Sequence, residues 1–432
     1  MTPRFTLRPV SSLTVQLSAL LLGFALQGAA SAAEESSGDL PAPAEVARVL
    51  KGAPMVRAAD SLIQAEEARK ARLEAGSHEW AVRLENQRRR ITPSGAPDER
   101  YHEWGATLER PLRLPGKAGL DSQLGAQGVA IAETNRGDTL HETSRYLLRS
   151  WFAWLQARET AAQWATQADI LGQQARAVTR RQQLGDAARL EAVQAEAALS
   201  QAEAQLAQAR VKERTAGEEL RRRFPGLSLP ERVSLSQPQA IPGSEQEWLD
   251  AILEHSHELE VSRLEAQRAQ TQATRSSQER LPDPTVGLKL GREKGGEENI
   301  VGVILSIPIP GPARRADADA ARAQADAATS REAAALQKVS AEAVSLYHSA
   351  SAARENWQSS KSAAERLNQA AEMTARAYKL GEGSLNDLLT ARRLANEAAL
   401  AARLAQLDAL EQRYRLLLDA HRLWALDDHG DH

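Results

Sequence analysis

The sequence predicts a mainly α-helical protein with a small β portion, in which a β-hairpin followed by long coiled-coil helices occurs twice. Three observations support this fold class. Long alanine-rich stretches favour helices, and short alternating segments that end at prolines favour strands. The same order of elements then recurs about 195–197 residues further along the 432-residue chain, which indicates an internal duplication. Because aromatic residues are only 4% of the chain, a thick globular core is not expected.

Residues 1–33 have the pattern of a secretory signal peptide. Arg4 and Arg8 precede an apolar segment at 13–26, and small residues suitable for cleavage follow at 30–33. The apolar segment is shorter than the roughly 20 residues of a membrane-spanning helix, which favours a cleaved signal over an anchor. No later stretch of the sequence is apolar enough for such a helix, so we expect any membrane crossing to use strands.

The first structural repeat is expected at residues 34–243. A loose N-terminal arm at 34–56, with a short helix near 45–50, is followed by a helix at 57–77. A hairpin with alternating apolar and polar residues follows at about 79–112. Two helices are expected at about 117–183 and 187–223, and the first would be about 100 Å long if continuous. Leu184-Gly185-Asp186 separates them, with the glycine as the C-cap of one helix and the aspartate as the N-cap of the next.

The second repeat is expected at residues 244–426. It starts with one helix at 244–278, whose first residues form a Ser-x-x-Glu capping box, and continues with a hairpin at about 284–309. Three prolines between 308 and 312 end the second strand, since proline has no N–H to donate. Two helices at about 313–379 and 385–426 are separated by a glycine-rich break in which Ser384 is the N-cap. Residues 427–432 form a polar tail.

The four expected strands have the length and pattern of membrane-crossing strands. Strands of about 9–11 residues cross a bilayer when tilted, and each of these has one apolar face. A soluble hairpin with one buried face would show the same alternation. Four strands cannot close a barrel, so a lipid-embedded sheet would need several copies; twelve strands from three copies would leave an aqueous lumen. The long helices would suit a closed helical tube or a plain coiled-coil spacer.

The mature chain resembles the TolC-type outer-membrane efflux proteins. The resemblance rests on LERPLRLPGK at 108–117, on LSIPIP at 305–310 and on the two Leu-Gly-(Asp/Glu) helix breaks. It implies a homotrimer with a 12-stranded β-barrel in outer-membrane lipid, on an α-helical barrel that extends through the periplasm. It also implies a periplasmic adaptor protein and an inner-membrane, proton-driven pump as partners. The Pro-Gly-Lys junction is similar to that of the heavy-metal (cobalt–zinc–cadmium) subgroup.

The resemblance also implies a gate at the second helix break, formed by Tyr378 and Asp387. In a trimer, Asp387 would form a ring of three carboxylates, and crowded carboxylates in a constriction favour cations. The alternatives are ordinary helix packing for Tyr378 and a carboxylate at a helix N-terminus for Asp387. The chain departs from some family members at Gly383 and Thr390, where those members carry a gate arginine and a second aspartate.

The two helix breaks are the expected adaptor-contacting tips. Glycine permits close backbone approach and an exposed leucine offers apolar contact, while the alternative is that both breaks are simply tight turns. The candidate contact residues are Leu184, Gly185, Leu380, Gly381 and Ser384.

The sequence shows no catalytic constellation, so no enzyme activity, cofactor or metal site is expected. His255 and His257 would point about 200° apart on one helix and could not chelate a metal from one face. A net charge of −3 argues against a nucleic-acid partner, and the absence of cysteine excludes disulfides and thiolate sites. The main alternative to an outer-membrane efflux duct is a soluble periplasmic coiled-coil scaffold or adaptor.

Overall fold

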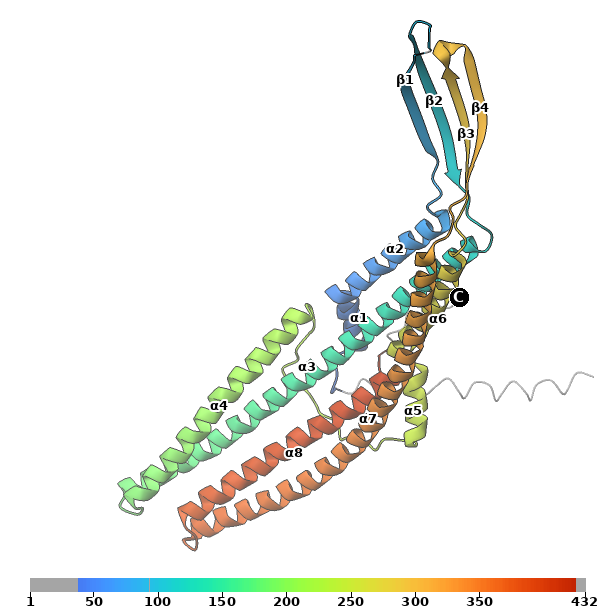
Figure 1. Cartoon of the computed structure of the whole chain (residues 1–432). Helices are drawn as coiled ribbons and strands as arrows, with labels where there is room; N and C mark the ends of the chain where they lie inside the picture. The colour runs from blue at the N-terminus through green and yellow to red at the C-terminus, as the bar shows by residue number, and fades with distance from the viewer. Residues whose placement is uncertain (1–37, 93, 425–432) are drawn as a thin grey trace, which may run out of the picture.

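A computed structural model describes residues 38–92 and 94–424. The expected signal peptide and polar tail lie outside these residues. The molecule is elongated, with a small sheet at one end and long helices that extend away from it to two helical tips (Figure 1). The prediction of a mainly helical fold with a small β portion is confirmed.

Eight α-helices make up most of the described chain. Those of the first half are α1 (Pro43–Lys51), α2 (Pro54–Ala75), α3 (Lys117–Gln183) and α4 (Arg189–Arg223), and those of the second are α5 (Glu245–Glu254), α6 (His257–Gln278), α7 (Pro312–Leu380) and α8 (Leu385–Asp419). Each long helix turns back into an antiparallel partner, so that α3 packs on α4 and α7 on α8. On α7 the buried positions are mostly alanines at intervals of three or four residues, which allows neighbouring helices to approach closely.

The four strands form one antiparallel sheet in chain order, β1-β2-β3-β4. The strands are β1 (Ala81–Ile91), β2 (Glu99–Pro111), β3 (Thr285–Glu293) and β4 (Glu298–Ser306), with the short 3₁₀ turn η1 (Lys294–Gly296) between the last two. In the register, Val82 lies opposite Leu108, Leu108 opposite Leu288, and Leu288 opposite Val303. Hairpins from both halves of the chain therefore share one sheet, and β1 and β4 are its edges.

The two faces of this sheet differ in polarity, because side chains alternate along each strand. One face carries exposed apolar residues, including Val82, Leu84, Leu290, Val301 and Val303. The opposite face carries charged residues and glycines, and ion pairs join charges on β1 to charges on β2 and β3. This ladder ends at Ser306 rather than 309, where the prolines that follow cannot donate backbone hydrogen bonds.

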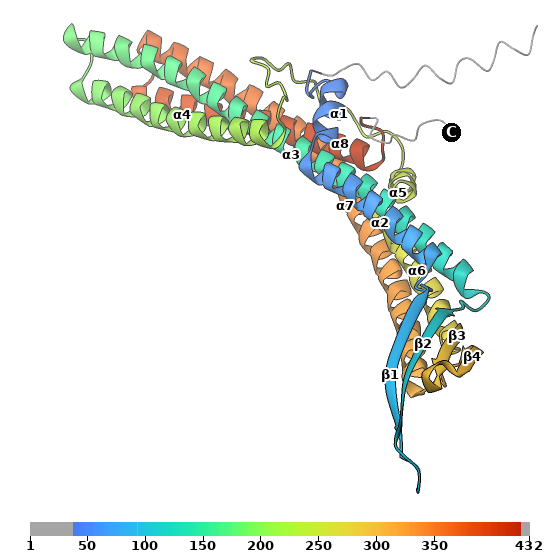
Figure 2. The same ribbon diagram turned by 90° about the horizontal axis from the view of Figure 1, so that it is seen from above.

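The largest core lies at the waist of the molecule, where α1, α5 and the segment after α4 pack on the long helices (Figure 2). Trp151 and Phe152 are fully enclosed there. Asp39 is buried; it accepts hydrogen bonds from the Ser236 N–H at 2.7 Å and from the Tyr414 hydroxyl at 2.9 Å. The short helix expected near 45–50 is present as α1. The segment 38–56 is not loose as expected, because it is anchored in the core.

The helix expected at 244–278 is two helices. α5 ends at Glu254, and Ser256 caps the start of α6 by accepting a hydrogen bond from the Leu259 N–H at 3.2 Å. The side chain of Ser256 competes with helix continuation by offering this local cap. The angular argument against His255 and His257 acting together is therefore wrong, since they do not lie on one continuous helix.

Lys117 ties the two halves together at the base of the sheet. Its side chain is 1% exposed, and its Nζ lies 2.9 Å from Asp283 Oδ1 and 3.2 Å from Glu279 Oε2. It also donates to the carbonyl oxygen of Leu281 at 2.7 Å. The Leu114 N–H donates to Asp283 at 3.0 Å. One buried cation thus fixes the strand-to-helix turn of the first half against the second.

The pKa of Asp283 reflects this cluster. Burial alone would raise it, but hydrogen bonds from Lys117, the Leu114 N–H and His78 outweigh burial and lower the pKa to about 2. His78 Nε2 lies 3.1 Å from Asp283 Oδ2. The carboxylate therefore stays ionised throughout the neutral pH range.

In the part of the chain that the structure describes, no helix combines the length and the apolar character that a membrane span requires.

Candidate functional site: the helical tips

The two helical tips have the same backbone turn. At the first, Leu184 is 76% exposed and Gly185 has a φ of +81°; at the second, Leu380 is 75% exposed and Gly381 has a φ of +80°. The residue after each glycine donates its N–H back to the helix, Asp186 to Arg181 at 2.8 Å and Glu382 to Ala377 at 2.9 Å. This closing bond suits a left-handed glycine. Each tip therefore presents an exposed leucine beside a glycine with open space around it.

Tyr378, near the end of α7, joins the two tips. Its hydroxyl donates to Glu191 Oε2 at 3.1 Å and accepts from Arg181 Nη1 at 3.1 Å. The guanidinium of Arg181 also lies 5.6 Å from the centre of the phenol ring. Arg181 is itself held by Asp186, with 3.2 Å between Nε and Oδ2. Tyr378 of the second half is therefore bound to charged residues of the first half.

The ionisation of Tyr378 suits this role as a donor. Burial and the hydrogen bond to Glu191 raise the pKa of Tyr378 above its ordinary value near 10. The phenol therefore keeps its proton at neutral pH and can donate to the Glu191 carboxylate.

A small apolar cluster packs beneath this contact. Its buried members come from all four long helices: Ala175, Val178, Ala192, Ala195, Ala375, Leu385 and Leu388. Tyr378 packs against it, so the residue combines inter-helix packing with a polar contact between the tips.

Asp387 has a different environment. Ser384 is the N-cap of α8, and its Oγ accepts from the Asp387 N–H at 3.1 Å and donates to Asp387 Oδ2 at 2.7 Å. The side chain of Asp387 is exposed. The hydrogen bonds of Asp387 and those of Tyr378 involve different residues, so one chain does not bring the two candidate gate residues into a common cluster. A ring of Asp387 carboxylates would require further copies.

At the first tip, the N-cap of α4 differs from the expected one. α4 begins at Arg189 with Ala188 as its N-cap, and no side chain caps it. The prediction that Asp186 is this N-cap is wrong, because its carboxylate binds Arg181 instead.

Sequence reasoning missed Arg181, Asp186 and Glu191 as partners of the candidate gate. The internal duplication held one signal: Glu191 stands six residues after Gly185, as Asp387 stands six residues after Gly381. Equivalent acidic residues at both breaks would have drawn attention to Glu191. Arg181 could not be found this way, since its role depends on how α3 and α7 approach each other.

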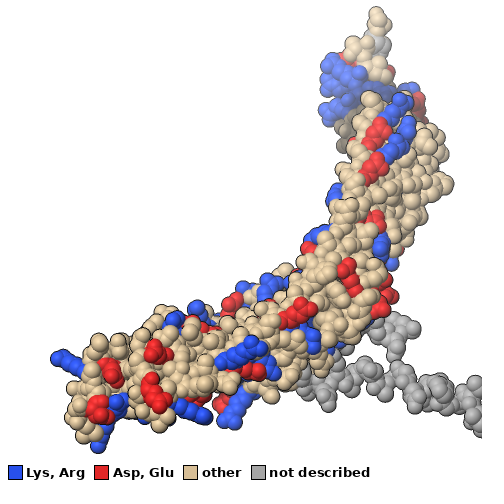
Figure 3. Space-filling model, turned by 90° about the horizontal axis from the view of Figure 1, so that it is seen from below, with Lys and Arg blue, Asp and Glu red and all other residues tan. Residues whose placement is uncertain are grey.

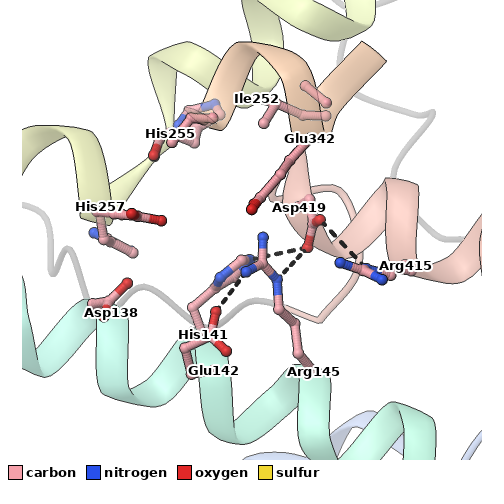
Figure 4. Close-up of a pocket in the computed structure, with 14 residues that line it drawn as sticks. Asp138, His141, Glu142, Arg145, Ile252, His255, His257, Glu342, Arg415 and Asp419 are labelled. Atoms are coloured by element: carbon pink, nitrogen blue, oxygen red, sulfur yellow. Dashed lines mark hydrogen bonds and ion pairs between the residues drawn. The ribbon is translucent and has the colours of Figure 1, made fainter. Parts of the chain in front are cut away.

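A second cluster, at the waist, contains four histidines from three parts of the chain: His141, the pair His255 and His257, and His421. The ring centre of His421 lies 5.3 Å from that of His141, 5.0 Å from that of His255 and 5.2 Å from that of His257. Figure 4 shows three of these residues around a cavity of about 40 Å³ with acidic and basic neighbours. The sequence analysis considered only His255 and His257 of these residues, because packing of α3, α5, α6 and the chain after α8 is what brings the four together.

An ion pair and a hydrogen bond join residues of the waist cluster. Arg145 Nε donates to Asp419 Oδ1 at 2.7 Å (Figure 4). His141 Nε2 lies 3.3 Å from the carbonyl oxygen of Leu418. Burial and the neighbouring charge of Arg145 lower the pKa of His141 to about 3, so it is neutral at physiological pH. Within residues 38–92 and 94–424, no group of three or more histidine, aspartate or glutamate residues is arranged to hold a metal ion.

Comparison with known proteins agrees with this architecture. Residues 248–418 match the family model described as Outer membrane efflux protein. The search of curated proteins finds no relative.

Solved structures of the same fold cover most of the chain. The Campylobacter jejuni CmeC outer membrane channel matches with a TM-score of 0.73 at 16% identity, covering 88% of this chain and 85% of that one. The outer membrane protein VceC of Vibrio cholerae matches with 0.73 at 15% identity, covering 88% and 95%. CusC, described as undergoing conformational changes with folding and transmembrane channel formation, matches with 0.74 at 12% identity, covering 88% and 91%. These identities establish the fold. With the family match over residues 248–418, they confirm the predicted resemblance to TolC-type efflux proteins.

Proposed function

We propose that this chain, which carries an outer membrane efflux protein domain at residues 248–418 and has the fold of outer-membrane channels, is one protomer of a trimeric exit duct. It would be the outer-membrane component of a tripartite efflux system, completed by a periplasmic adaptor and an inner-membrane pump. The duct is passive: the pump supplies the energy, and the chain itself performs no enzymatic reaction.

The observation that carries this proposal is the exposed apolar face of an open four-stranded sheet. Its strands are 9 to 13 residues long, which is enough to cross a bilayer at a tilt. Lipid would cover the apolar face, but it cannot satisfy the backbone groups at the edges of β1 and β4. Several copies must therefore join edge to edge.

Three copies give the barrel that fits best. β1 and β4 run in opposite directions, so β4 of one copy can pair with β1 of the next and keep the antiparallel order. Twelve strands would enclose a water-filled lumen, lined by the face that carries charged residues and glycines. The long helices would continue this lumen away from the membrane.

We propose that Tyr378 and Asp387 gate the far end of the duct. The hydrogen bonds of Tyr378 to Arg181 and Glu191 hold the second tip against the first, and their loss would free α7 and α8 to move. Asp387 would contribute a carboxylate ring near the threefold axis. Such a ring would attract cations and slow their passage.

The adaptor would bind the two tips at the same end. Leu184 and Leu380 supply apolar contact area, while Gly185 and Gly381 leave room for an approaching backbone. Ser384 completes the second tip as the N-cap of α8.

The exported cargo is proposed to be divalent heavy-metal ions. This assignment rests on the Pro-Gly-Lys junction that ends in Lys117, and the fold is one that CusC shares. Growth of a deletion strain on graded cobalt, zinc and cadmium tests it: restored tolerance on complementation supports the assignment, whereas unchanged tolerance to all three opposes it.

Membrane fractionation tests the duct itself. We expect the full-length protein in the detergent-extracted outer membrane, as a trimer that dissociates on heating before gel electrophoresis. A purely soluble monomer would contradict the proposal and would favour a periplasmic scaffold or adaptor instead.

A further inference from the structure

The apolar face of the sheet ends in a group of basic residues at the hairpin turns, far from the helices. We call this group the arginine rim; it consists of Arg88, Arg90, Arg100, His102 and Arg292. All five side chains are exposed. Figure 3 shows the corresponding concentration of Lys and Arg near that end of the molecule.

The strands separate their charges between the two faces of the sheet. By the alternation of side chains and the observed register, the rim shares its face with Val82, Leu108 and Leu288. Among the residues of the four strands, every carboxylate falls on the opposite face: Glu85, Glu99, Glu103, Glu109, Glu293 and Glu298. The rim therefore has no acidic neighbour on its own face of these strands.

The rim lies directly beyond the apolar residues of this face, which together form an apolar band across the strands. Trp104 and Arg292 are opposite each other in the register and stand at the upper limit of the band. The pair Arg88 and His102 lies two residues further along the strands. Two residues span roughly 7 Å of strand, so this pair stands at headgroup height if Trp104 marks the edge of the hydrocarbon.

The rim carries positive charge that the chain does not neutralise. Arg90 lies directly opposite Arg100 in the register, although Arg90 also forms an ion pair with Asp98. Among the described residues, no carboxylate pairs with Arg88, Arg100 or Arg292. Like charges directly opposite each other destabilise a pair of strands, so an external anion would relieve a cost that the fold itself imposes.

The helix-side end of the same face is different. There the arginine of β2 is Arg110, whose guanidinium lies 5.4 Å from the ring centre of Trp80 and donates to the carbonyl oxygen of His78 at 2.9 Å. The positive charge is thus concentrated at one end of the band, which matches a bilayer whose anionic headgroups are concentrated on that side.

We propose that the arginine rim binds the phosphate groups of phosphorylated glycolipid in the outer leaflet. The inference rests on the proposed function, which places this face of the sheet in the outer membrane. Guanidinium groups bind phosphate oxygens in a bidentate geometry, and several arginines at headgroup height can hold more than one phosphate. Bound glycolipid would fix the height of the barrel and seal it against the surrounding lipid.

The test measures phosphorylated glycolipid that co-purifies with the full-length protein from outer membranes, by mass spectrometry of the native complex. The double variant R88Q/R100Q should lose roughly tenfold or more of this lipid, given the usual attraction of an anionic surface for each basic residue. R88K/R100K keeps the charge and should retain most of it. The matched control R83Q/K289Q removes two charges from the opposite face of the sheet and should retain all of it.

A second variant keeps the inference testable if R88Q/R100Q does not fold. R292Q alters a single exposed position beside Trp104 and should lose about threefold of the bound lipid. Addition of inorganic phosphate at the same phosphorus concentration should leave the lipid in place. Unchanged glycolipid in R88Q/R100Q and R292Q, an equal loss in R83Q/K289Q, or displacement by inorganic phosphate would each overturn the inference.

A failure of the lipid inference can be distinguished from a failure of the proposed function. If the wild-type protein is a soluble monomer, the duct proposal fails. If it is an outer-membrane trimer whose lipid content does not depend on the rim, only the lipid inference fails.

Discussion

The two halves of the chain meet through polar contacts at both ends of the long helices, and these two contacts differ in burial. At the base of the sheet, Lys117 is 1% exposed and is surrounded by Asp283 and Glu279. At the tips, Arg181 is 41% exposed where it binds Asp186, and Tyr378 is only partly buried. The first contact is enclosed, whereas the second is open to water.

This difference separates a structural contact from one that can open. Breaking a buried ion cluster leaves uncompensated charge in a poorly solvated place, which costs several kcal/mol. An exposed contact can exchange its hydrogen bonds for water at little cost. The contact at the sheet end is therefore expected to be harder to break than the contact at the tips, as the proposed gate requires.

The largest effect is expected at the buried contact. Lys117→Met should lower the free energy of unfolding by about 3 kcal/mol or more, because Asp283 would lose its buried cation. The control is Lys338→Met. The Lys338 ammonium binds Glu258 at 2.7 Å, but the lysine side chain is 55% exposed, so the cost of this substitution should stay below about 1 kcal/mol. Thermal unfolding followed by circular dichroism measures both. If the two variants melt at the same temperature, the buried contact of Lys117 contributes no more to stability than the exposed contact of Lys338.

The same contact predicts a dependence on pH. The pKa of Asp283 is lowered to about 2, so its contribution to stability is complete above its ordinary pKa near 3.8 and is lost as the pH falls through about 2. The melting temperature should therefore fall between pH 4 and pH 2, and Lys117→Met should reduce this fall. An acid transition that is identical in the variant would show that other carboxylates cause it.

At the tips, Tyr378→Phe should leave stability nearly unchanged and favour opening. It removes the hydroxyl that binds Glu191 and Arg181, which is worth about 1 kcal/mol per chain at a partly exposed site. If three chains open together, the open population should rise about tenfold or more. Single-channel conductance in planar bilayers measures this. Tyr347→Phe, at the waist, is the control, and equal conductance in both variants would mean that Tyr378 only packs.

Asp387 can be tested against its own capping partner. Asp387→Ala should raise conductance and weaken cation block, because it removes the proposed carboxylate ring. Ser384→Ala removes the cap but keeps the carboxylate, and it should leave cation selectivity unchanged. If the two variants have the same selectivity, Asp387 serves the helix N-terminus and not the channel.

The smallest effect on stability is expected at the two equivalent N-cap positions. Ala188 and Ser384 each stand three residues after the tip glycine, but only Ser384 caps its helix through its side chain. Ser384→Ala should cost about 1 kcal/mol, and Ala188→Ser should gain up to about 1 kcal/mol. Denaturant titration of both variants measures the pair. A change of the same sign in both would show that the two tips do not differ in capping.

The sequence by itself determined the mainly helical fold, the order of strands and helices and the turns at Gly185 and Gly381. These features depend on local causes: alternation, proline, alanine and left-handed glycine act within a few residues. The outward position of Val82 and Leu84 followed from the same alternation. The family resemblance added the candidate gate residues.

The tertiary structure alone decided which residues those positions meet. Arg181 and Glu191 reach Tyr378 only because α3, α4 and α7 converge, and the break at Ser256 brings His255 and His257 to one cavity. Lys117 was visible only as part of a junction motif, yet its burial against Asp283 joins segments far apart in the chain. Such contacts depend on helix register and on burial, which no local pattern encodes. For that reason, the arginine rim could be recognised only once the register of the four strands was known.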